Sequence, residues 1–366
     1  PLQEKKEQTP TDTRTVQTHV PLPRAVKAIY MTSCVVGTPS FRNSLVSLID
    51  ETEINAVVID IKDFSGTLSF SPSTPALAPA WTNARCGTKD MEAFVKLLHE
   101  KGVYVVGRIT VFQDPFYTAR HPELAVKRKS DGAVWKDYKG LSFIDVGAKP
   151  YWDYVVSLGI DSYNVGFDEL NFDYVRYPSD GNMQDIAFTY SGGKNKQENL
   201  ESFFRYLHDS LTDATRYGDV VHKNTGRDSA VPYLSVDLFG LTMNSTDDLV
   251  IGQVEERAAP YFDFIAPMVY PSHYPNGFIG LGNPNQHPYE VVRYALTEGA
   301  RRLVATTTPV DGFAHTRSGT STPAVYQKPI YDIQKLRPWL QDFDYGGEYG
   351  IAEVRAQIKA TGDVGL

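Results

Sequence analysis

Cysteine is almost absent: the 366-residue chain has only Cys34 and Cys86. Two cysteines are too few for a disulfide-rich scaffold or for a zinc site of the CxxC type. Two readings remain open. The residues are either two free, partly buried thiols or a disulfide that joins loops following the first two strands, as would suit an exported protein.

Long apolar runs and excess positive charge are also missing. No window approaches 18 consecutive apolar residues, so no membrane span is expected. The net charge of −8 argues against a nucleic-acid partner, which normally requires a basic surface. The eight histidines form no HExxH or His-x-His pair, and no GxSxG motif occurs. We therefore expect neither a catalytic metal nor an organic cofactor.

The N-terminal residues 1–25 are polar and rich in proline and threonine, with little to bury. This composition predicts a flexible tether ahead of one domain that covers residues 26–366. The chain begins at Pro1 without a methionine, as expected if a signal peptide or anchor has been removed. We expect an extracellular or cell-surface location.

Short β-branched runs alternate with amphipathic helical stretches in the remaining sequence, a pattern typical of parallel βα units. The predicted strands are 26–33, 56–63, 104–112, 169–177, 232–239, 264–270 and 336–343. Helices are predicted near 41–49 and at 91–101, 151–163, 199–217, 249–259, 289–304 and 349–360. This order predicts an α/β fold, a (β/α)8 TIM-type barrel that lacks the eighth strand in this chain.

Polar residues gather where the predicted strands end, which is the active-site face of such barrels. The two-residue period of a strand places Asn171 with Asp173, and Ser235 with Asp237, on a shared face. Neighbouring strands lie about 4.8 Å apart, so Asp173 and Asp237 can form a pair of carboxylates at the barrel mouth. Glycosidic cleavage requires such a pair, one acid and one nucleophile or base. Alternatively, one of them is a salt-bridged support, to Arg176 or to Lys62.

The segments VVIDIKD, GRITVFQDP, GFDELNFDYVRYP, SVDLFG, APMVYPSHY and RPWLQDFDYGG resemble an uncharacterised family of bacterial glycoside hydrolase domains. That family is distantly similar to the α-amylase and α-galactosidase barrels, and the resemblance covers roughly residues 26–366. It implies that Asp173, which ends the fourth strand, is the nucleophile, and that Asp237, which ends the fifth, is the general acid. The acid is usually Glu in those barrels, and their Trp-rich eighth strand has no counterpart here.

Further residues near the strand ends are candidates for contact with substrate. They are Asp60, Lys62, Asp63, Arg108, Asn171, Arg176, Tyr270, His273, Trp339 and Gln341. Asp60, Lys62 and Asp63 could instead form a buried ion-pair network, and Arg108 could close a salt bridge inside the barrel. Trp339 is either a platform for a sugar ring or a plug of the barrel core.

Together these features predict a glycoside hydrolase that cleaves O-glycosidic bonds of an oligo- or polysaccharide with paired carboxylates and retention of configuration. The 22 tyrosines suit a sugar-lined cleft. The alternative is a non-catalytic carbohydrate-binding barrel that acts in cell-surface or cell-wall organisation.

Overall fold

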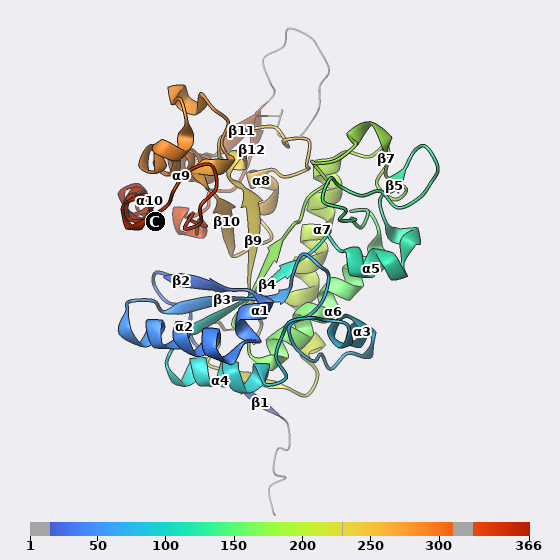
Figure 1. Cartoon of the computed structure of the whole chain (residues 1–366), viewed down its shortest axis with the longest axis vertical. Helices are drawn as coiled ribbons and strands as arrows, with labels where there is room; N and C mark the ends of the chain where they lie inside the picture. Colours follow the sequence, from blue (N-terminus) through green and yellow to red (C-terminus); the bar gives the residue numbers. More distant parts are fainter. Residues whose placement is uncertain (1–14, 229, 310–324) are drawn as a thin grey trace, which may run out of the picture.

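The fold is built on one curled parallel sheet. The computed structural model describes residues 15–228, 230–309 and 325–366. Six strands pair in parallel in the order β10-β9-β6-β4-β3-β2 and curve into a half-barrel (Figure 1). Their bounds are Ala28–Met31 (β2), Ala56–Lys62 (β3), Tyr104–Thr110 (β4), Glu169–Asp173 (β6), Tyr233–Phe239 (β9) and Phe264–Met268 (β10).

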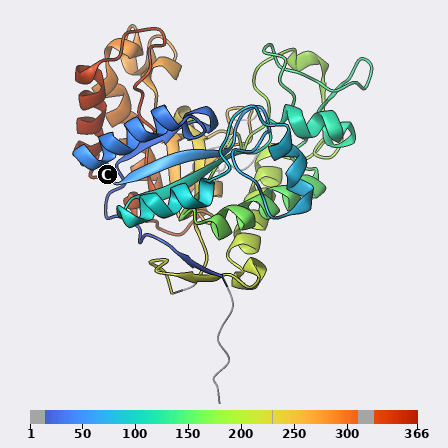
Figure 2. The same cartoon turned by 60° about the horizontal axis from the view of Figure 1, so that its bottom comes forward.

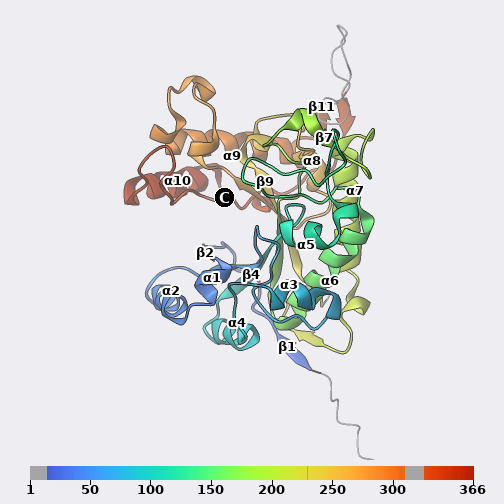
Figure 3. The same cartoon turned by 45° about the vertical axis from the view of Figure 1, so that its right-hand side comes forward.

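The longer helices cover the convex face of this sheet (Figure 3). The helices of the described chain are Ser33–Val36 (α1), Pro39–Glu51 (α2), Ala78–Thr82 (α3), Met91–Glu100 (α4), Pro115–Arg120 (α5), Lys149–Val165 (α6), Lys196–Leu211 (α7), Glu255–Ala258 (α8), Pro288–Val304 (α9) and Ile351–Val364 (α10). The main core lies between sheet and helices and includes Ile59, Leu170 and Phe172. A smaller apolar cluster around Val58 and Tyr104 fills the concave face, on which Trp339 packs. The polar ends of the strands lie above this cluster.

The predicted barrel class is confirmed, with six continuous strands and a seventh segment. Residues 336–343 do not form the predicted continuous strand. Only Leu336 and Trp339 bridge in parallel to Ile265 and Met268 of β10. Arg337 and Trp339 donate their backbone N–H groups to the carbonyl oxygens of Ile265 and Pro267, but Pro267 has no N–H to donate in return, which interrupts the ladder. In the part of the chain that the structure describes, no eighth strand closes the sheet.

Several predicted elements are shorter than expected, and in two of them the backbone turns at non-glycine residues with positive φ. Strand β6 ends at Asp173 and not at residue 177, since Tyr174 has a φ of 51°. The predicted helix 249–259 shrinks to the four residues of α8, because Leu249 and Val250 have φ values of 50° and 63°. This left-handed conformation cannot continue a strand or a right-handed helix.

Within the predicted tether of residues 1–25, residues 16–19 are held against the domain. Strand β1 (Val16–Thr18) pairs in parallel with β8 (Val221–Lys223) at the N-terminal end of the sheet (Figure 2). Next to it His19 is buried, with Nδ1 3.0 Å from Asp168 Oδ1 and Nε2 2.9 Å from His222 Nδ1. Three polar side chains on distant segments satisfy one another here, which composition alone does not reveal. Residues 1–14 lie outside the described residues.

Two small two-stranded sheets lie outside the half-barrel. Both are antiparallel: β5 (Lys127–Arg128) pairs with β7 (Ile186–Ala187), and β11 (Thr307–Pro309) pairs with β12 (Val325–Gln327). Among the helices of the described ranges, none is long and apolar enough to cross a membrane.

Cys34 and Cys86 form a disulfide, so the reading of two free thiols is wrong. The bond ties α1 to the long loop that follows β3. The two segments approach so closely beside it that a Cβ atom on Gly37 would lie 2.6 Å from the carbonyl oxygen of Gly87. The bond therefore secures one wall above the C-terminal ends of β2 and β3.

Replacing both cysteines by serine should lower the free energy of unfolding by about 2–4 kcal/mol. The bond spans 52 residues of sequence, and its loss frees this loop in the unfolded chain. Denaturant unfolding of the double variant, and of the wild type with and without reductant, checks this. A reductant-independent midpoint in the wild type would contradict it.

Candidate active site

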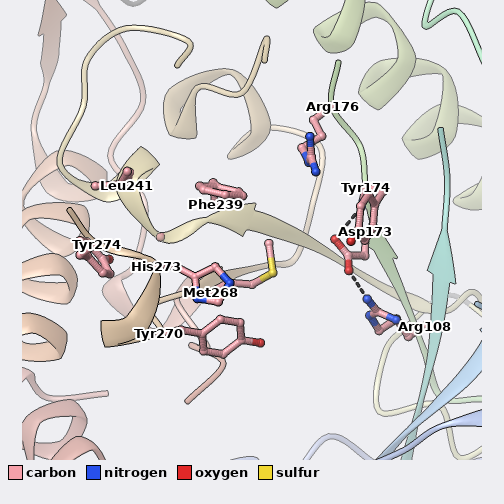
Figure 4. A pocket seen from close by; sticks show the side chains of 11 residues that line it. Arg108, Asp173, Tyr174, Arg176, Phe239, Leu241, Met268, Tyr270, His273 and Tyr274 are labelled. Carbon is pink, nitrogen blue, oxygen red and sulfur yellow. Dashed lines mark hydrogen bonds and ion pairs between the residues drawn. The ribbon is translucent and has the colours of Figure 1, made fainter. Parts of the chain in front are cut away.

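One guanidinium organises the C-terminal end of the sheet. Arg108 lies on β4, and its Nη1 is 2.8 Å from Asp60 Oδ1 on β3. Its Nη2 donates to Asp173 Oδ2 at the end of β6 (Figure 4). Its Nε is 3.6 Å from Asp237 Oδ2 on β9. Three carboxylates from three strands thus converge on a single positive charge. Although burial works to lower the pKa of Arg108, Asp173 and Asp60 hold it well above its usual value.

Asp237 lies deepest in this cluster and is fully buried. Its Oδ1 accepts hydrogen bonds from Asn171 Nδ2 at 2.9 Å and from Trp339 Nε1 at 2.8 Å. Its Oδ2 has no hydrogen-bond partner among the residues that the structure describes. Burial, reinforced by the nearby Asp173 carboxylate, raises the pKa of Asp237 to about 8. Asp237 is therefore mainly protonated at neutral pH, with Oδ2 as the oxygen free to carry the proton.

Asp60 has a second partner that the sequence did not single out. Tyr30, on β2, donates its hydroxyl to Asp60 Oδ2 at 2.5 Å. The Tyr30 ring also faces the Arg108 guanidinium, 5.6 Å from its centroid. Burial raises the pKa of Asp60 above its usual range, although Arg108 opposes this shift.

Two cavities open over the cluster. The first has a volume of about 230 Å³ and is lined by Arg108, Asp173, Tyr174, Arg176, Phe239, Gly240, Leu241, Met268, Tyr270, His273 and Tyr274 (Figure 4). The second, of about 500 Å³, is lined by Tyr30, Asp60, Phe64, Arg108, Gln113, Asp137, Lys139, Leu141, Phe143, Tyr174, Arg176, Ser179 and Asp180. Since Arg108, Tyr174 and Arg176 line both, the cavities adjoin along these three side chains.

The structure brings together nine of the predicted site residues. Asp60, Arg108, Asp173, Arg176, Tyr270 and His273 line one or both cavities. Asn171, Asp237 and Trp339 lie beneath them and are joined by hydrogen bonds. The shared face expected for strands β6 and β9 is found, because Asn171 also donates to Ser235 Oγ at 3.0 Å. Asp173 reaches a cavity, whereas Asp237 lines neither, contrary to the expectation that both carboxyl groups face an open cleft.

Three predicted substrate contacts lie elsewhere. Lys62 is fully buried on the convex side, 2.9 Å from Asp114 Oδ2, because the register shifts between Asp60 and Lys62 and reverses the face. Asp63 accepts hydrogen bonds from the Ser33 hydroxyl at 2.8 Å and from the backbone N–H of the nearby Ser65, and so holds a turn.

Gln341 is the third of these residues, and it too is buried away from both cavities. Its Oε1 accepts from Ser272 N at 3.1 Å, and its backbone N–H donates to Gln357 Oε1 at 2.9 Å. Gln341 therefore links the loop after β10 to α10.

Tyr174 is a cavity residue that strand alternation does not predict. Continued alternation would turn it towards the helices with Leu170 and Phe172. Its positive φ instead brings the ring to both cavities. Its backbone N–H donates to Asp173 Oδ1 at 2.5 Å, which helps to fix that carboxylate. The sequence signal for this turn is Pro178, because a proline indicates that the strand ends close to this position.

The last residue of β9, Phe239, and the loop after β10 supply the aromatic wall of the first cavity. Tyr270 and His273 contact each other edge to face, with ring centroids 5.4 Å apart. Burial raises the pKa of the Tyr270 hydroxyl, helped by the Asp237 carboxylate, and lowers the pKa of His273. Both side chains are therefore neutral hydrogen-bonding groups at pH 7. Within the described ranges, no group of three or more His, Cys, Asp or Glu side chains is placed to hold a metal ion.

The curled parallel sheet of this protein, with cavities at the C-terminal ends of its strands, places it among the TIM-barrel-like α/β proteins. The glycoside hydrolase domain of PgaB (BpsB) from Bordetella bronchiseptica shares this fold. It is 12% identical, with a TM-score of 0.60, over 93% of this chain and 92% of that domain. A hypothetical protein from Ruminiclostridium thermocellum ATCC 27405 is 32% identical over 53% of this chain and 95% of its own, with a TM-score of 0.46.

Residues 28–366 match the family described as "Putative glycosyl hydrolase domain", and the chain belongs to that family. A search of curated proteins gave no match. Family and fold together support a glycosidase at the level of general class.

The protonated state of Asp237 predicts a specific dependence of stability on pH. Its pKa is raised on folding, so the unfolded chain ionises above about pH 4 while the folded protein keeps the proton. Stability should therefore fall as pH rises from about 4 to 8. Asp237→Asn should remove this part of the decline and be more stable than the wild type at pH 7 by roughly 2–4 kcal/mol. Denaturant unfolding from pH 4 to 8 measures it.

Glu255 provides the matched control. It is fully buried, its pKa is also raised to about 8 by burial, and it lines neither cavity. Glu255→Gln should reduce the same pH dependence by a similar amount. A difference between wild type and Asp237→Asn that stays constant from pH 4 to 8 would show that Asp237 is ionised in the folded protein.

Proposed function

We propose that this protein is a retaining glycoside hydrolase that cleaves an O-glycosidic bond in an oligo- or polysaccharide. The observation that carries the proposal is the unequal pair at Arg108: Asp173 lines the first cavity, whereas Asp237 is fully buried beneath it, where burial raises its pKa. Two carboxyl groups in contrasting environments are what an acid and a nucleophile require.

In this mechanism Asp173 attacks the anomeric carbon. Arg108 Nη2 and Tyr174 N hold one oxygen each of its carboxylate, which orients it towards a sugar in the first cavity. Because Asp173 and Asp237 contact adjacent nitrogens of the same guanidinium, they lie close together. That favours retention, for which about 5 Å separates the carboxyl groups, over inversion, which needs room for a water.

Asp237 supplies the proton to the leaving oxygen. Its Oδ2 lies under Arg108 Nε, so we infer that substrate binding shifts the guanidinium and uncovers this oxygen. Catalytic hydrogen bonds are often incomplete before substrate is bound. Asn171 and Trp339 hold the other oxygen in place throughout.

We also propose an extracellular or cell-surface location. The disulfide between Cys34 and Cys86 supports it, because such bonds persist mainly in oxidising compartments.

The second candidate function is carbohydrate binding without catalysis, in cell-surface or cell-wall organisation. It is favoured by the complete burial of Asp237, which leaves Asp173 as the one member of the pair on a cavity. Release of reducing ends from a panel of polysaccharides separates the two, since a binding protein releases none.

Asp173→Asn should lower the rate of glycoside cleavage about a thousandfold or more. The variant keeps the shape of the side chain but loses the nucleophile and the charge that stabilises the oxocarbenium-like transition state. Asp63→Asn is the matched control, because Asp63 directly follows strand β3 of the same sheet and lines neither cavity. Reducing-end assays on both variants, with thermal unfolding to confirm folding, test this. Full activity in Asp173→Asn would exclude the mechanism.

The activity should fall as pH rises through about 8, because Asp237 then loses the proton that it must donate. In Asp237→Asn this alkaline limb of the kcat/KM profile should disappear along with most of the activity. Glu255→Gln should retain the alkaline limb, although the pKa of Glu255 in the wild type is also raised to about 8. An alkaline limb that survives in residual Asp237→Asn activity would assign the acid to another group.

A further inference from the structure

Arg176 presents a positive charge to both cavities. It follows β6, and its Nη1 donates to Tyr177 O at 3.1 Å and to Ser179 Oγ at 3.0 Å. The guanidinium lies 5.0 Å from the centroid of the Tyr174 ring and 5.9 Å from that of Phe239 (Figure 4). Among the described residues, no carboxylate lies within 4 Å of it, and its Nε and Nη2 make no hydrogen bond there.

Other arginines in similarly sheltered positions have acidic partners. Arg302 contacts Glu256, and Arg337 lies 2.6 Å from Glu169. Sheltered charges are normally paired, because removal from water is costly. Burial accordingly lowers the pKa of Arg176. Its hydrogen bonds and ring contacts use Nη1 and the face of the guanidinium, and no carboxylate within the described protein lies within 4 Å, which points to an acidic partner from outside.

The acidic residues around the cavities do not fill this role. Asp60 and Asp173 are held by Arg108. Asp137 Oδ1 accepts the backbone N–H groups of Lys139 at 2.9 Å and Leu141 at 2.8 Å, so it stabilises its own turn. Asp180 is exposed, at the rim of the second cavity. A second cation, the exposed Lys139, lines the same cavity and has no carboxylate within 4 Å in the described chain.

We propose that the site takes an anionic glycan, and that Arg176 binds a carboxylate or sulfate group of a sugar unit next to the bond that is cleaved. This inference rests on the proposed function and narrows its substrate class. The Nε and Nη2 edge of a guanidinium matches two oxygens of such a group. The rings of Tyr174 and Phe239 keep the guanidinium in place. Because Arg176 lines both cavities, one charged sugar unit can bind where the two cavities meet.

The test measures binding in the Asp173→Asn background, where turnover does not consume the ligand. Affinity electrophoresis compares polygalacturonate with fully methyl-esterified pectin, and dextran sulfate with dextran. Each pair keeps its backbone and differs in charge, and the two pairs distinguish carboxylate from sulfate. We expect tighter binding to the charged member of at least one pair, weakened by added NaCl.

Adding Arg176→Gln should weaken binding to the charged glycan about tenfold to a hundredfold and leave any binding to the neutral one unchanged. Arg176→Lys should restore part of the affinity, since lysine keeps the positive charge but lacks the two parallel N–H donors of the guanidinium. Arg120→Gln is the matched control: Arg120 also lies over a ring, 3.6 Å from the Phe116 centroid, and bonds a carbonyl, but lines neither cavity.

Equal binding of charged and neutral members in both pairs, or an unchanged dissociation constant in Arg176→Gln, would overturn the assignment. A different result would contradict the proposed glycoside hydrolase function: the wild type would release no reducing ends from any glycan. Preference for a charged glycan without cleavage would retain Arg176 as an anion site on a carbohydrate-binding protein.

Discussion

The site depends on the imbalance of charge around Arg108. One guanidinium faces three carboxyl groups, from Asp60, Asp173 and Asp237. A single positive charge cannot neutralise three negative ones in a sheltered place, so the group that is hardest to solvate keeps its proton. That group is Asp237, which is fully buried. Burial and the nearby Asp173 carboxylate, acting against the attraction of Arg108, thus raise the pKa of Asp237 and make two chemically identical side chains unequal.

Much of this arrangement could be predicted from the sequence, since it depends on regular strands. Apolar β-branched runs located all six continuous strands, and the two-residue period placed Asn171, Asp173, Ser235 and Asp237 on one face. The two-residue period of a strand does not show how deeply each side chain is buried. Asp173 ends its strand and reaches a cavity, whereas Asp237 is covered by Trp339 and Arg108, which come from other parts of the chain.

The errors arise where the backbone departs from regular geometry. One shift in register moves Lys62 to the convex face, and one positive φ turns Tyr174 into the cavities. Both depend on tertiary packing that no local pattern encodes. His19 was missed for a related reason: its partners Asp168 and His222 are 149 and 203 residues away in sequence.

The missing closure of the barrel has a chemical consequence. The two edges of the sheet are β2 and the segment that bridges to β10, and they meet through Tyr30 and Trp339, whose ring centroids are 5.9 Å apart. Tyr30 also donates to Asp60, and Trp339 donates to Asp237. The side chains that join the edges therefore hold two of the three carboxyl groups around Arg108. Any movement that opens the half-barrel at this seam would also release the acid from its hydrogen bond, so the shape of the fold and the protonation of the site are coupled.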